Sequence, residues 1–482
     1  MNTEPLVLAL DLGTGSVKAG LVTQSGELVA QASQGYPVTS LHTGWSETDP
    51  RDWWAGVVAA VQAALQGLEP KRVQAISFSG QMHGVVLCSA SGEPLRNAVL
   101  WSDTRSARQL EAYAALSPPL LARLGNPPVA GFAGPTLLWL QAHEPQNYRA
   151  ARWALQPKDW LRLRCTGEAA SEPSDASGTL LYDLTTNTWS AETLAALGLN
   201  AALLPPLRAS GEVAGRLLPA PAAELGLPAG IPVVMGAADT AAALLGTGLG
   251  AGEAQLTVGT GAQIVVASPE LPTTPAGGHV FRDAQEGFYA LAALQNAGNV
   301  LEWVRATLRL TWPELYAAAQ EVAGQQRGGQ GTPLFLPYLT GDRTPHLDPH
   351  ARAAWLGLEA AHDWRHMAYA AFEGVALSMA EAADALDLPA APLKLAGGGS
   401  LNPWWRQLLA DSLGRTLAVT QVAGASVLGA ARLGWQGLGL APVLAPIAVT
   451  EYVVPHPDRI PATRHAQFRA AYGANRMGER LV

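Results

Sequence analysis

The chain has 482 residues, of which 48% are hydrophobic and 15% are charged, and this balance predicts a folded protein and excludes a disordered one. At roughly 150 residues per domain, the length predicts about two to four domains. The formal net charge of −8 argues against nucleic acid or an anionic membrane as the main partner.

A strand, a tight turn and a second strand are predicted at the start of the chain. The apolar run Leu6–Leu10 ends at Asp11, the turn Gly13–Gly15 follows, and Val17–Val22 is apolar again. Strand and helix patterns then alternate, and the predicted segments are the helix Trp53–Leu65, the strand Val73–Phe78, the apolar segments Thr136–Ala142 and Trp160–Leu163, the strand Pro232–Met235 and the helix Thr240–Leu245. This alternation indicates α/β layers.

The second half of the chain begins with the same pattern. Ala254–Val258 leads into the turn Gly259–Gly261, and Gln263–Ala267 resumes an apolar run. Both turns read Gly-Thr-Gly, so we interpret them as an internal repeat of two similar halves. The later predicted elements are the helix Trp364–Leu386, the strand Leu393–Ala396 and the helix Pro403–Leu413. The stretch Pro219–Pro232 is predicted to be a linker near the junction of the halves, and Gly324–Gly331 a flexible loop.

The two cysteines, Cys88 and Cys165, form no CxxC pair, so buried free thiols in a reducing compartment are expected. The N-terminus, Met1–Pro5, has no basic cluster of the kind that signal peptides carry. The longest uncharged stretches are broken by glycine and proline, so no transmembrane helix is predicted. We therefore expect a cytoplasmic protein that binds neither nucleic acid nor a membrane.

The two Gly-Thr-Gly turns have the composition of a phosphate site. Glycine lets backbone N–H groups approach phosphate oxygens without a Cβ clash, and small hydroxyls add donors. Two ordinary β-turns are the alternative. None of the four lysines lies in a Walker A loop, no GxGxxG opens a helix, and no protein-kinase motif set occurs. The candidate phosphate-binding residues are Gly13, Thr14, Gly15, Ser16, Lys18, Gly259, Thr260 and Gly261.

Two carboxylates follow apolar strands. Asp11 ends the first strand beside the first turn, and Asp239 follows the strand Pro232–Met235 and begins the helix at Thr240. Because α/β sheets form their sites at the carboxyl ends of strands, Asp239 is a candidate general base. Asp11 is a candidate ligand of Mg²⁺, directly or through water. A helix N-cap is the alternative role for Asp239.

Two further features have both a functional and an ordinary interpretation. The loop Ser79–Gly84 (SGQMHG) follows a predicted strand, so His83 is either a site residue or a loop histidine. Trp45 is either a ring that contacts a sugar or part of the core. The sequence has no HExxH zinc motif and no GxSxG elbow, which argues against the hydrolases that use them.

These residues lie in segments that resemble the FGGY carbohydrate kinases. The segments follow the family's order along nearly the whole chain; SGQMHG and GDRTPH are specific, and the Gly-Thr-Gly turns are not. They are DLGTGSVK (Asp11–Lys18), GWSETDP (Gly44–Pro50), SGQMHG (Ser79–Gly84), WSDTR (Trp101–Arg105), SDASGT (Ser174–Thr179), GAADTAAA (Gly236–Ala243), FLPYLTGDRTPH (Phe335–His346) and AGGGSLNPWWRQLLAD (Ala396–Asp411). The run Ala353–Glu373 is similar to the family's C-terminal signature region.

The resemblance implies an α/β fold of two actin-like (ribonuclease H-like) domains with the active site in the cleft between them. It implies transfer of the ATP γ-phosphate, with Mg²⁺, to D-xylulose, which gives D-xylulose 5-phosphate. Asp239 matches the catalytic base, and Asp11 matches the residue that organises the Mg²⁺. The remaining matches are Gln81, Met82, His83 and Thr240 at the sugar, Thr14, Gly259 and Thr260 at the phosphates, and Gly398, Gly399 and Asn402 at the adenosine.

The sequence departs from the family pattern at Thr240, where members acting on D-xylulose usually carry Asn. Thr reaches less far, so a kinase for another ketopentose or a pentitol, such as ribulose or arabitol, is the alternative. The family's N-terminal signature has a Lys where this chain has Thr136, a change without an evident catalytic role. A non-catalytic actin-like sensor of sugar or nucleotide is the rival from another class, and the presence of Asp239 argues against it.

The division into domains also follows from the resemblance. Residues 1–245 are predicted to form a sugar-binding N-terminal domain that carries the first phosphate turn. Residues 246–482 are predicted to form an ATP-binding C-terminal domain. Packing of its last residues on the first domain is one candidate arrangement. The expected ligands are a small sugar and ATP. A homodimer is the candidate assembly.

Overall fold

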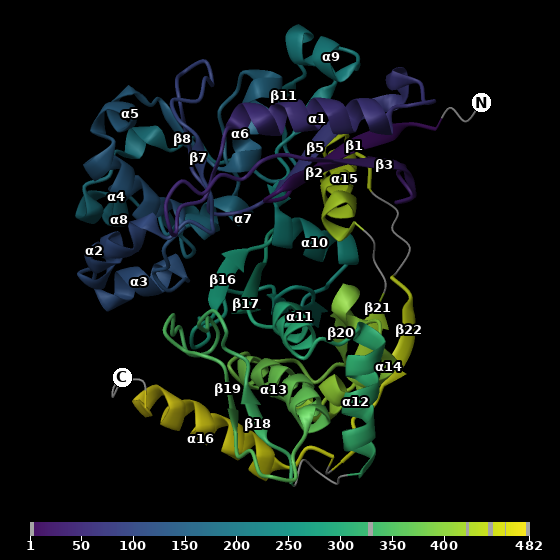
Figure 1. Cartoon of the computed structure of the whole chain (residues 1–482). Coiled ribbons are helices and arrows are strands. Elements are labelled where there is room, and N and C mark those ends of the chain that lie inside the picture. The colour runs from purple at the N-terminus through teal and green to yellow at the C-terminus, as the bar shows by residue number, and fades with distance from the viewer. Residues whose placement is uncertain (1–3, 326–330, 421–423, 442–446, 458, 479–482) are drawn as a thin grey trace.

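The computed structural model describes residues 4–325, 331–420, 424–441, 447–457 and 459–478. Helices and strands alternate along the chain and form two seven-stranded sheets, one above the other in Figure 1. Helices pack against both sheets, so the predicted α/β layers are present. Most of the loop predicted at Gly324–Gly331 lies outside the described residues.

The first sheet is built from strands of the first half of the chain. Its strands are β1 (Leu6–Leu12), β2 (Ser16–Val22), β3 (Leu28–Gly35), β5 (Val73–Gly80), β11 (Val213–Arg216), β12 (Pro232–Val234) and β13 (Ala237–Ala238). The strand order is β11-β12-β5-β1-β2-β3, and β13 pairs with β5. β1 is antiparallel to β2 and parallel to β5, so Asp11 lies opposite both Lys18 and Ser79.

Helices cover both faces of this sheet. On one face, α1 (Pro50–Ala64) shares a buried cluster with Leu8. On the other, α15 (Ala425–Gly437) shares a cluster with Val7, as expected when successive side chains of a strand face opposite sides. Although α15 comes from late in the sequence, Figure 1 shows this yellow-green helix among the purple strands of the first sheet. Its Trp435 donates a hydrogen bond from Nε1 to the carbonyl oxygen of Thr23, at 3.0 Å.

A helix stands where the sequence predicted a proline-rich linker. This helix, α9 (Pro219–Leu225), packs against α1, and Trp54 Nε1 donates to Glu224 Oε2 at 2.6 Å. Pro219 occupies the first turn, where a missing N–H costs nothing and a fixed φ favours the helix. The linker prediction is therefore wrong for residues 219–225, because proline in the first turn starts a helix and does not break it.

The other elements of the first half are short and lie mostly beside the sheet (Figure 1). They are β4 (Glu47–Thr48), β6 (Val86–Cys88), β7 (Ala98–Val99), β8 (Trp153–Leu155), β9 (Tyr182–Asp183), β10 (Thr188–Trp189), α2 (Leu110–Ala114), α3 (Pro118–Leu124), α4 (Ala133–His143), α5 (Pro145–Ala150), α6 (Pro157–Thr166), α7 (Pro173–Ala176) and α8 (Ala191–Leu197). Both cysteines are buried free thiols, as the sequence predicted.

The second sheet repeats the central arrangement of the first. Its strands are β14 (Ala254–Val258), β15 (Ala262–Ser268), β16 (His279–Arg282), β17 (Phe288–Leu294), β20 (Leu393–Ala396), β21 (Leu417–Thr420) and β22 (Val449–Val453), and the order is β16-β17-β15-β14-β20-β21-β22. β14 is antiparallel to β15 and parallel to β20, just as β1 is to β2 and β5. The two predicted strand–turn–strand hairpins are both present.

The helices of the second half, except α15, pack around α13, which is buried along most of its length. The elements outside the sheet are α11 (Gly298–Thr307), α12 (Trp312–Gln325), α13 (Trp364–Asp384), α14 (Pro403–Leu413), α16 (Ala462–Gly478), β18 (Leu334–Leu336) and β19 (Ala354–Leu356). Among the described helices, none combines the length and the hydropathy that crossing a bilayer requires.

Helix α10 (Asp239–Thr247) packs closely against α15 at glycine positions. A Cβ added to Gly429 would lie 1.8 Å from the carbonyl oxygen of Ala242, and one added to Gly246 would lie 1.9 Å from that of Ala425. Only glycine permits this approach of the two backbones. Because α15 lies on the first sheet, the contact fixes α10 relative to that sheet.

We expect Gly429→Ala to destabilise the protein by about 1–3 kcal/mol or more, because the new methyl group must displace the backbone of α10. The matched control is Gly473→Ala in α16, where no atom lies within 4 Å of the added Cβ. Alanine favours a helix over glycine by up to about 1 kcal/mol, so the control should be neutral or more stable. Urea unfolding measures both, and equal midpoints for the two variants would contradict the close contact.

Candidate active site

Two carboxylates stand at adjacent strand ends of the first sheet. Asp11 is the next-to-last residue of β1, and Asp239 begins α10 directly after β13. β5 pairs in parallel with both strands, and its Ser79 donates a hydrogen bond to Asp11 Oδ1 at 3.0 Å. The structure therefore brings the two predicted carboxylates to the same edge of the sheet, where α/β folds place their sites.

Both carboxyl groups are half-buried, and their pKa values are raised. Burial, followed by the negative charge of Asp11, raises the pKa of Asp239 to about 6. The N–H and hydroxyl groups of Thr240 oppose this by donating to Asp239 Oδ1, at 2.5 and 3.2 Å. Burial also raises the pKa of Asp11. The hydrogen bond from Ser79 and the positive charge of Lys18 act in the opposite direction. A carboxylate with a pKa near 6 is suited to accept a proton at neutral pH.

The first glycine turn offers backbone N–H groups to an anion. In the described part of the chain, no acceptor is recorded for the N–H groups of Thr14 and Gly15. The turn is closed by a hydrogen bond of 2.9 Å from Gly13 N to the carbonyl oxygen of Ser16. The side chain of Lys18 is exposed on β2, opposite Asp11. Unpaired N–H groups beside one cation suit a phosphate group.

The second turn has the same property. Within the described residues, the N–H groups of Thr260 and Gly261 have no recorded acceptor. The carbonyl oxygen of Gly259 instead accepts from Gly298 N at 3.1 Å, and a Cβ on Gly298 would lie 2.4 Å from that oxygen. The N-terminus of α11 is therefore held against this turn.

The predicted adenosine-binding segment lies beside the second turn. It follows β20, the parallel neighbour of β14. Added Cβ atoms would lie 2.3 Å from Val258 O for Gly397 and 2.7 Å from Val258 Cγ1 for Gly399, so the glycines press against the strand end that precedes the turn. Asn402 Oδ1 accepts from two N–H groups of α14, at 3.0 and 3.2 Å. Gly398, between Gly397 and Gly399, is exposed.

The loop after β5 connects the first turn to the second half of the chain. Gln81 Nε2 donates to the carbonyl oxygen of Gly13 at 3.1 Å, and no described residue donates to its buried Oε1. Met82 is buried, and its Sδ lies 3.9 Å from the Tyr289 hydroxyl of β17. Of the predicted loop residues, Gln81 thus contacts the first phosphate turn, and Met82 contacts β17 of the second half.

His83 is a neutral hydrogen-bond acceptor. Its Nδ1 lies 2.6 Å from the carbonyl oxygen of Gly178, and because a carbonyl only accepts, Nδ1 carries the proton and Nε2 is left with a lone pair. Burial, together with the positive charge of Arg343, lowers the pKa of His83 to about 4. The hydrogen bond to Gly178 acts in the opposite direction. The ring stacks on Phe132 with centroids 3.9 Å apart. A Cβ on Gly178 would lie 2.9 Å from Nδ1, so a larger residue here would displace the imidazole.

A fully buried ion cluster supports the strand end that carries Asp239. The partners of Lys158 Nζ are Asp159 Oδ1 at 2.8 Å, Asp175 Oδ2 at 2.9 Å and Glu172 Oε1 at 3.1 Å. Burial opposes the charge of Lys158, but these carboxylates outweigh it and raise its pKa. The hydroxyl of Ser174 donates to Glu172 at 2.8 Å and accepts from the N–H of Ala238 at 2.9 Å. The cluster therefore helps to fix the residue that precedes Asp239.

In the described part of the chain, Trp45 has no recorded contact with the other predicted site residues. The guanidinium of Arg105 covers its ring at 3.6 Å, and the ring of Trp139 meets it at 5.6 Å. Another tryptophan, Trp101, donates from Nε1 to Thr14 Oγ1 at 2.9 Å and so lies at the first turn. Sequence reasoning gave Trp101 no role, although it lies in the segment WSDTR that carries the resemblance.

The residues at the sheet edge fit Mg²⁺ and ATP. Mg²⁺ prefers oxygen ligands and usually binds one or two carboxylates together with phosphate oxygens and water. In the described part of the chain, only one oxygen of Asp11 has a recorded hydrogen-bond donor. No group of three or more His, Cys, Asp or Glu residues that could hold a metal occurs among the described residues, and a magnesium ion shared with phosphates needs none.

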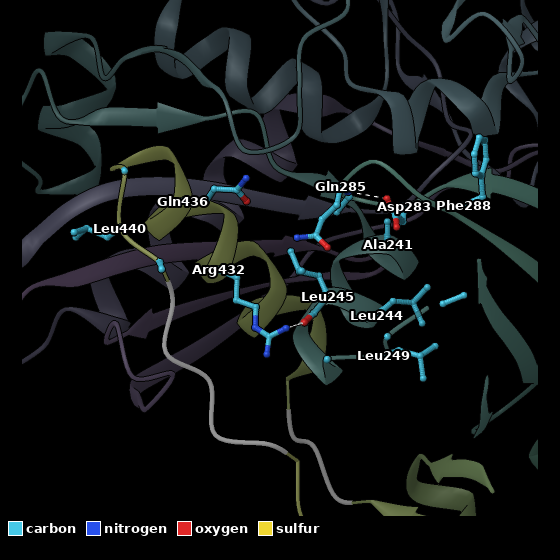
Figure 2. A pocket seen from close by; sticks show the side chains of 16 residues that line it. Ala241, Leu244, Leu245, Leu249, Asp283, Gln285, Phe288, Arg432, Gln436 and Leu440 are labelled. Atoms are coloured by element: carbon cyan, nitrogen blue, oxygen red, sulfur yellow. Dashed lines mark hydrogen bonds between the residues drawn. The ribbon is translucent and has the colours of Figure 1, made fainter. Parts of the chain in front are cut away.

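A separate cavity of about 680 Å³ lies along α10 and α15 (Figure 2). Leu244 and Leu245 of α10, Arg432 and Gln436 of α15, and Gln285 line it, and Arg432 donates to the carbonyl oxygen of Leu245. Neither carboxylate and neither glycine turn lines this cavity. The candidate active site is therefore at the sheet edge and not in this cavity.

Comparison with solved structures defines the class of protein. The xyloylose kinase from Brucella ovis matches with a TM-score of 0.86 and 33% identity and covers 98% of both chains. The xylulose kinase from Rhodospirillum rubrum matches with a TM-score of 0.89 and 27% identity, over 97% of this chain and 98% of that chain. The fold is thus that of two-domain carbohydrate kinases, as the sequence predicted.

The family follows from sequence comparison. The chain belongs to the FGGY family of carbohydrate kinases: the N-terminal domain model matches residues 6–246, and the C-terminal domain model matches residues 254–436. It is 37% identical to the xylulose kinase of Escherichia coli (strain K12), over 89% of each chain. The predicted family is confirmed, and the protein is an ATP-dependent sugar kinase that uses Mg²⁺.

Proposed function

We propose that this protein phosphorylates D-xylulose with ATP to give D-xylulose 5-phosphate, and that Asp239 is the general base. The observation that carries the proposal is the half-buried Asp239 carboxylate, with a pKa raised to about 6, at a strand end shared with Asp11. The names of the relatives support the sugar, because those from Escherichia coli, Bacillus subtilis and Streptomyces rubiginosus are all xylulose kinases.

In this proposal Asp239 accepts the proton from the attacking hydroxyl of the sugar. The N–H of Thr240 holds Asp239 Oδ1 and leaves Oδ2 for that proton. Asp11 would hold Mg²⁺ through water, and the ion would supply positive charge to the phosphate oxygens. Because phosphoryl transfer is mostly positioning and charge stabilisation, one base, one metal and two amide-lined turns are sufficient.

The two glycine turns are proposed to hold the phosphates. Thr14 and Gly15 offer N–H groups in the first turn, and Thr260 and Gly261 offer them in the second. Lys18 is the one lysine of the chain proposed to act there. The adenosine is proposed to lie along the remaining predicted residues, which are Gly398, Gly399 and Asn402, beside the second turn.

The sugar is proposed to bind at the loop after β5. His83 Nε2 has a lone pair that can accept a hydrogen bond from a sugar hydroxyl, and so can the unpaired Oε1 of Gln81. Met82 adds an apolar contact. A kinase for ribulose or arabitol is the second candidate, since the short Thr240 hydroxyl is already engaged with Asp239 at 3.2 Å.

Three further expectations stay proposals. The N-terminal domain, residues 1–245, would bind the sugar, and the C-terminal domain, residues 246–482, would bind ATP. The proposed location is the cytoplasm, and the proposed assembly is a homodimer. Sedimentation of the purified chain would test the dimer.

A panel of sugars tests the substrate. With ATP and Mg²⁺ in a coupled assay for ADP, we expect D-xylulose to give the highest kcat/KM among D-xylulose, D-ribulose, L-ribulose and arabitol. The unpaired acceptors on Gln81 and His83 should discriminate between sugars by the orientation of their hydroxyl groups. An equal or higher kcat/KM for a ribulose or for arabitol would overturn the assignment of D-xylulose.

Replacement of the base tests the role of Asp239. Asp239→Ala should lower kcat by at least about 10²-fold, the usual contribution of a general base, and should leave the Kd for the sugar largely unchanged. Asp283→Ala is the control, because this carboxyl group is also partly buried but contacts Gln285 and Gly287 outside the sheet edge. Activity retained in Asp239→Ala would contradict the assignment.

The pH profile tests the raised pKa. A base works only when it is ionised, so kcat/KM for the sugar should fall as the pH drops through the pKa of Asp239. Burial and the charge of Asp11 put that midpoint near 6, and bound Mg²⁺ should move it toward lower pH by offsetting Asp11. We expect a midpoint above the ordinary value of 3.8 that shifts downward with Mg²⁺ concentration. A profile flat from pH 4 to pH 7 would rule out a raised pKa.

A further inference from the structure

The segment Gly341–His346 of the second half is a rigid loop. Asn296 Nδ2 donates to the carbonyl oxygen of Gly341 at 2.6 Å, and the hydroxyl of Thr344 donates to that of Gly277 at 2.8 Å. The two neighbours of Arg343, Asp342 and Thr344, are both buried. The loop therefore holds the backbone of Arg343 in one place and leaves only its side chain free to reach outward.

The guanidinium of Arg343 has no anionic partner in the described part of the chain, and its recorded neighbour is the ring of Trp101. Within the described residues, no carboxylate lies within ion-pair distance of it, and no hydrogen bond from it is recorded. Burial lowers its pKa, so the group is partly removed from water. Arg464, by contrast, is buried and paired with Glu373. Because a partly desolvated cation without an anionic partner is costly, Arg343 is a candidate for binding a ligand.

The guanidinium lies near both the first phosphate turn and the proposed sugar loop of the first half. It lies 5.7 Å from the ring centroid of Trp101, and Trp101 donates to Thr14 Oγ1 in the first phosphate turn. The charge of Arg343 also lowers the pKa values of His83 and His279, which places it near both imidazoles. Arg343 is thus a residue of the second half whose charge acts on the proposed sugar loop.

We propose that Arg343 is a sugar-binding residue that donates hydrogen bonds to hydroxyl oxygens of the substrate, opposite His83. This inference rests on the proposed function and names a contact from the second half of the chain. The fork of a guanidinium can donate to two neighbouring hydroxyl oxygens at once, and lysine cannot reproduce that geometry. His83 Nε2 accepts while Arg343 donates, so together they can hold a polyol from both sides.

The test is a comparison of KM values for the sugar and for ATP in Arg343→Gln and Arg343→Lys. A hydrogen bond to a charged group, when lost, usually weakens binding by about tenfold or more. We expect the KM for D-xylulose to rise at least about tenfold in Arg343→Gln and less in Arg343→Lys, with the KM for ATP changed less than twofold. Arg51→Gln, whose side chain is exposed at 66%, is the control and should match the wild type.

Thermal unfolding gives a second measurement that does not depend on turnover. D-xylulose should raise the Tm of the wild type and of Arg51→Gln but not that of Arg343→Gln, while an ATP analogue should raise all three. Equal sugar-induced shifts, or KM values for sugar and ATP that rise together, would overturn the role of Arg343 and leave it as a structural contact to Trp101. A wild type that neither phosphorylates nor is stabilised by D-xylulose, but responds to another sugar, would overturn the proposed substrate instead, and the same comparison would then be read with that sugar.

Discussion

Asp11 and Asp239 repel each other, and both are partly removed from water, yet the fold holds them at neighbouring strand ends. The structure opposes this cost at several points. Ser79 donates to Asp11, the N–H of Thr240 donates to Asp239, and Asp239 is the first residue of α10, where the helix dipole favours a negative charge. These contacts keep both carboxylates in place without neutralising them, so Mg²⁺ and a substrate proton can do so instead.

The rest of the first half holds this arrangement from behind. The buried cluster around Lys158 reaches the backbone of Ala238 through Ser174, and the glycine contact between α10 and α15 fixes the helix that Asp239 begins. Buried ion clusters of this kind seldom add net stability, but they specify one geometry because each member leaves a costly unpaired charge if it moves. The position of Asp239 is therefore set by groups that never touch the substrate.

Local patterns in the sequence were enough to predict much of this arrangement. The bounds of β14, β20 and α14 are those that the sequence predicted, because apolar runs there end at glycine or proline. The carboxylates at strand ends could be predicted for the same reason. The sequence did not predict which tryptophan lies at the first turn, because contacts between segments far apart in the chain decide it: Arg105 covers Trp45, and Trp101 donates to Thr14. Nor did it predict α9, where proline starts a helix.

The position of α15 has a consequence for how the chain is made. One face of the first sheet, including Val7, Ala9 and Ala75, is covered only when α15 arrives, and α15 is separated from these strands by most of the second half. During synthesis the strands leave the ribosome long before the helix does. An apolar strand face without its cover is prone to aggregate, and contacts between distant segments form slowly. This face of the nascent first half therefore stays uncovered until nearly the entire chain has been translated.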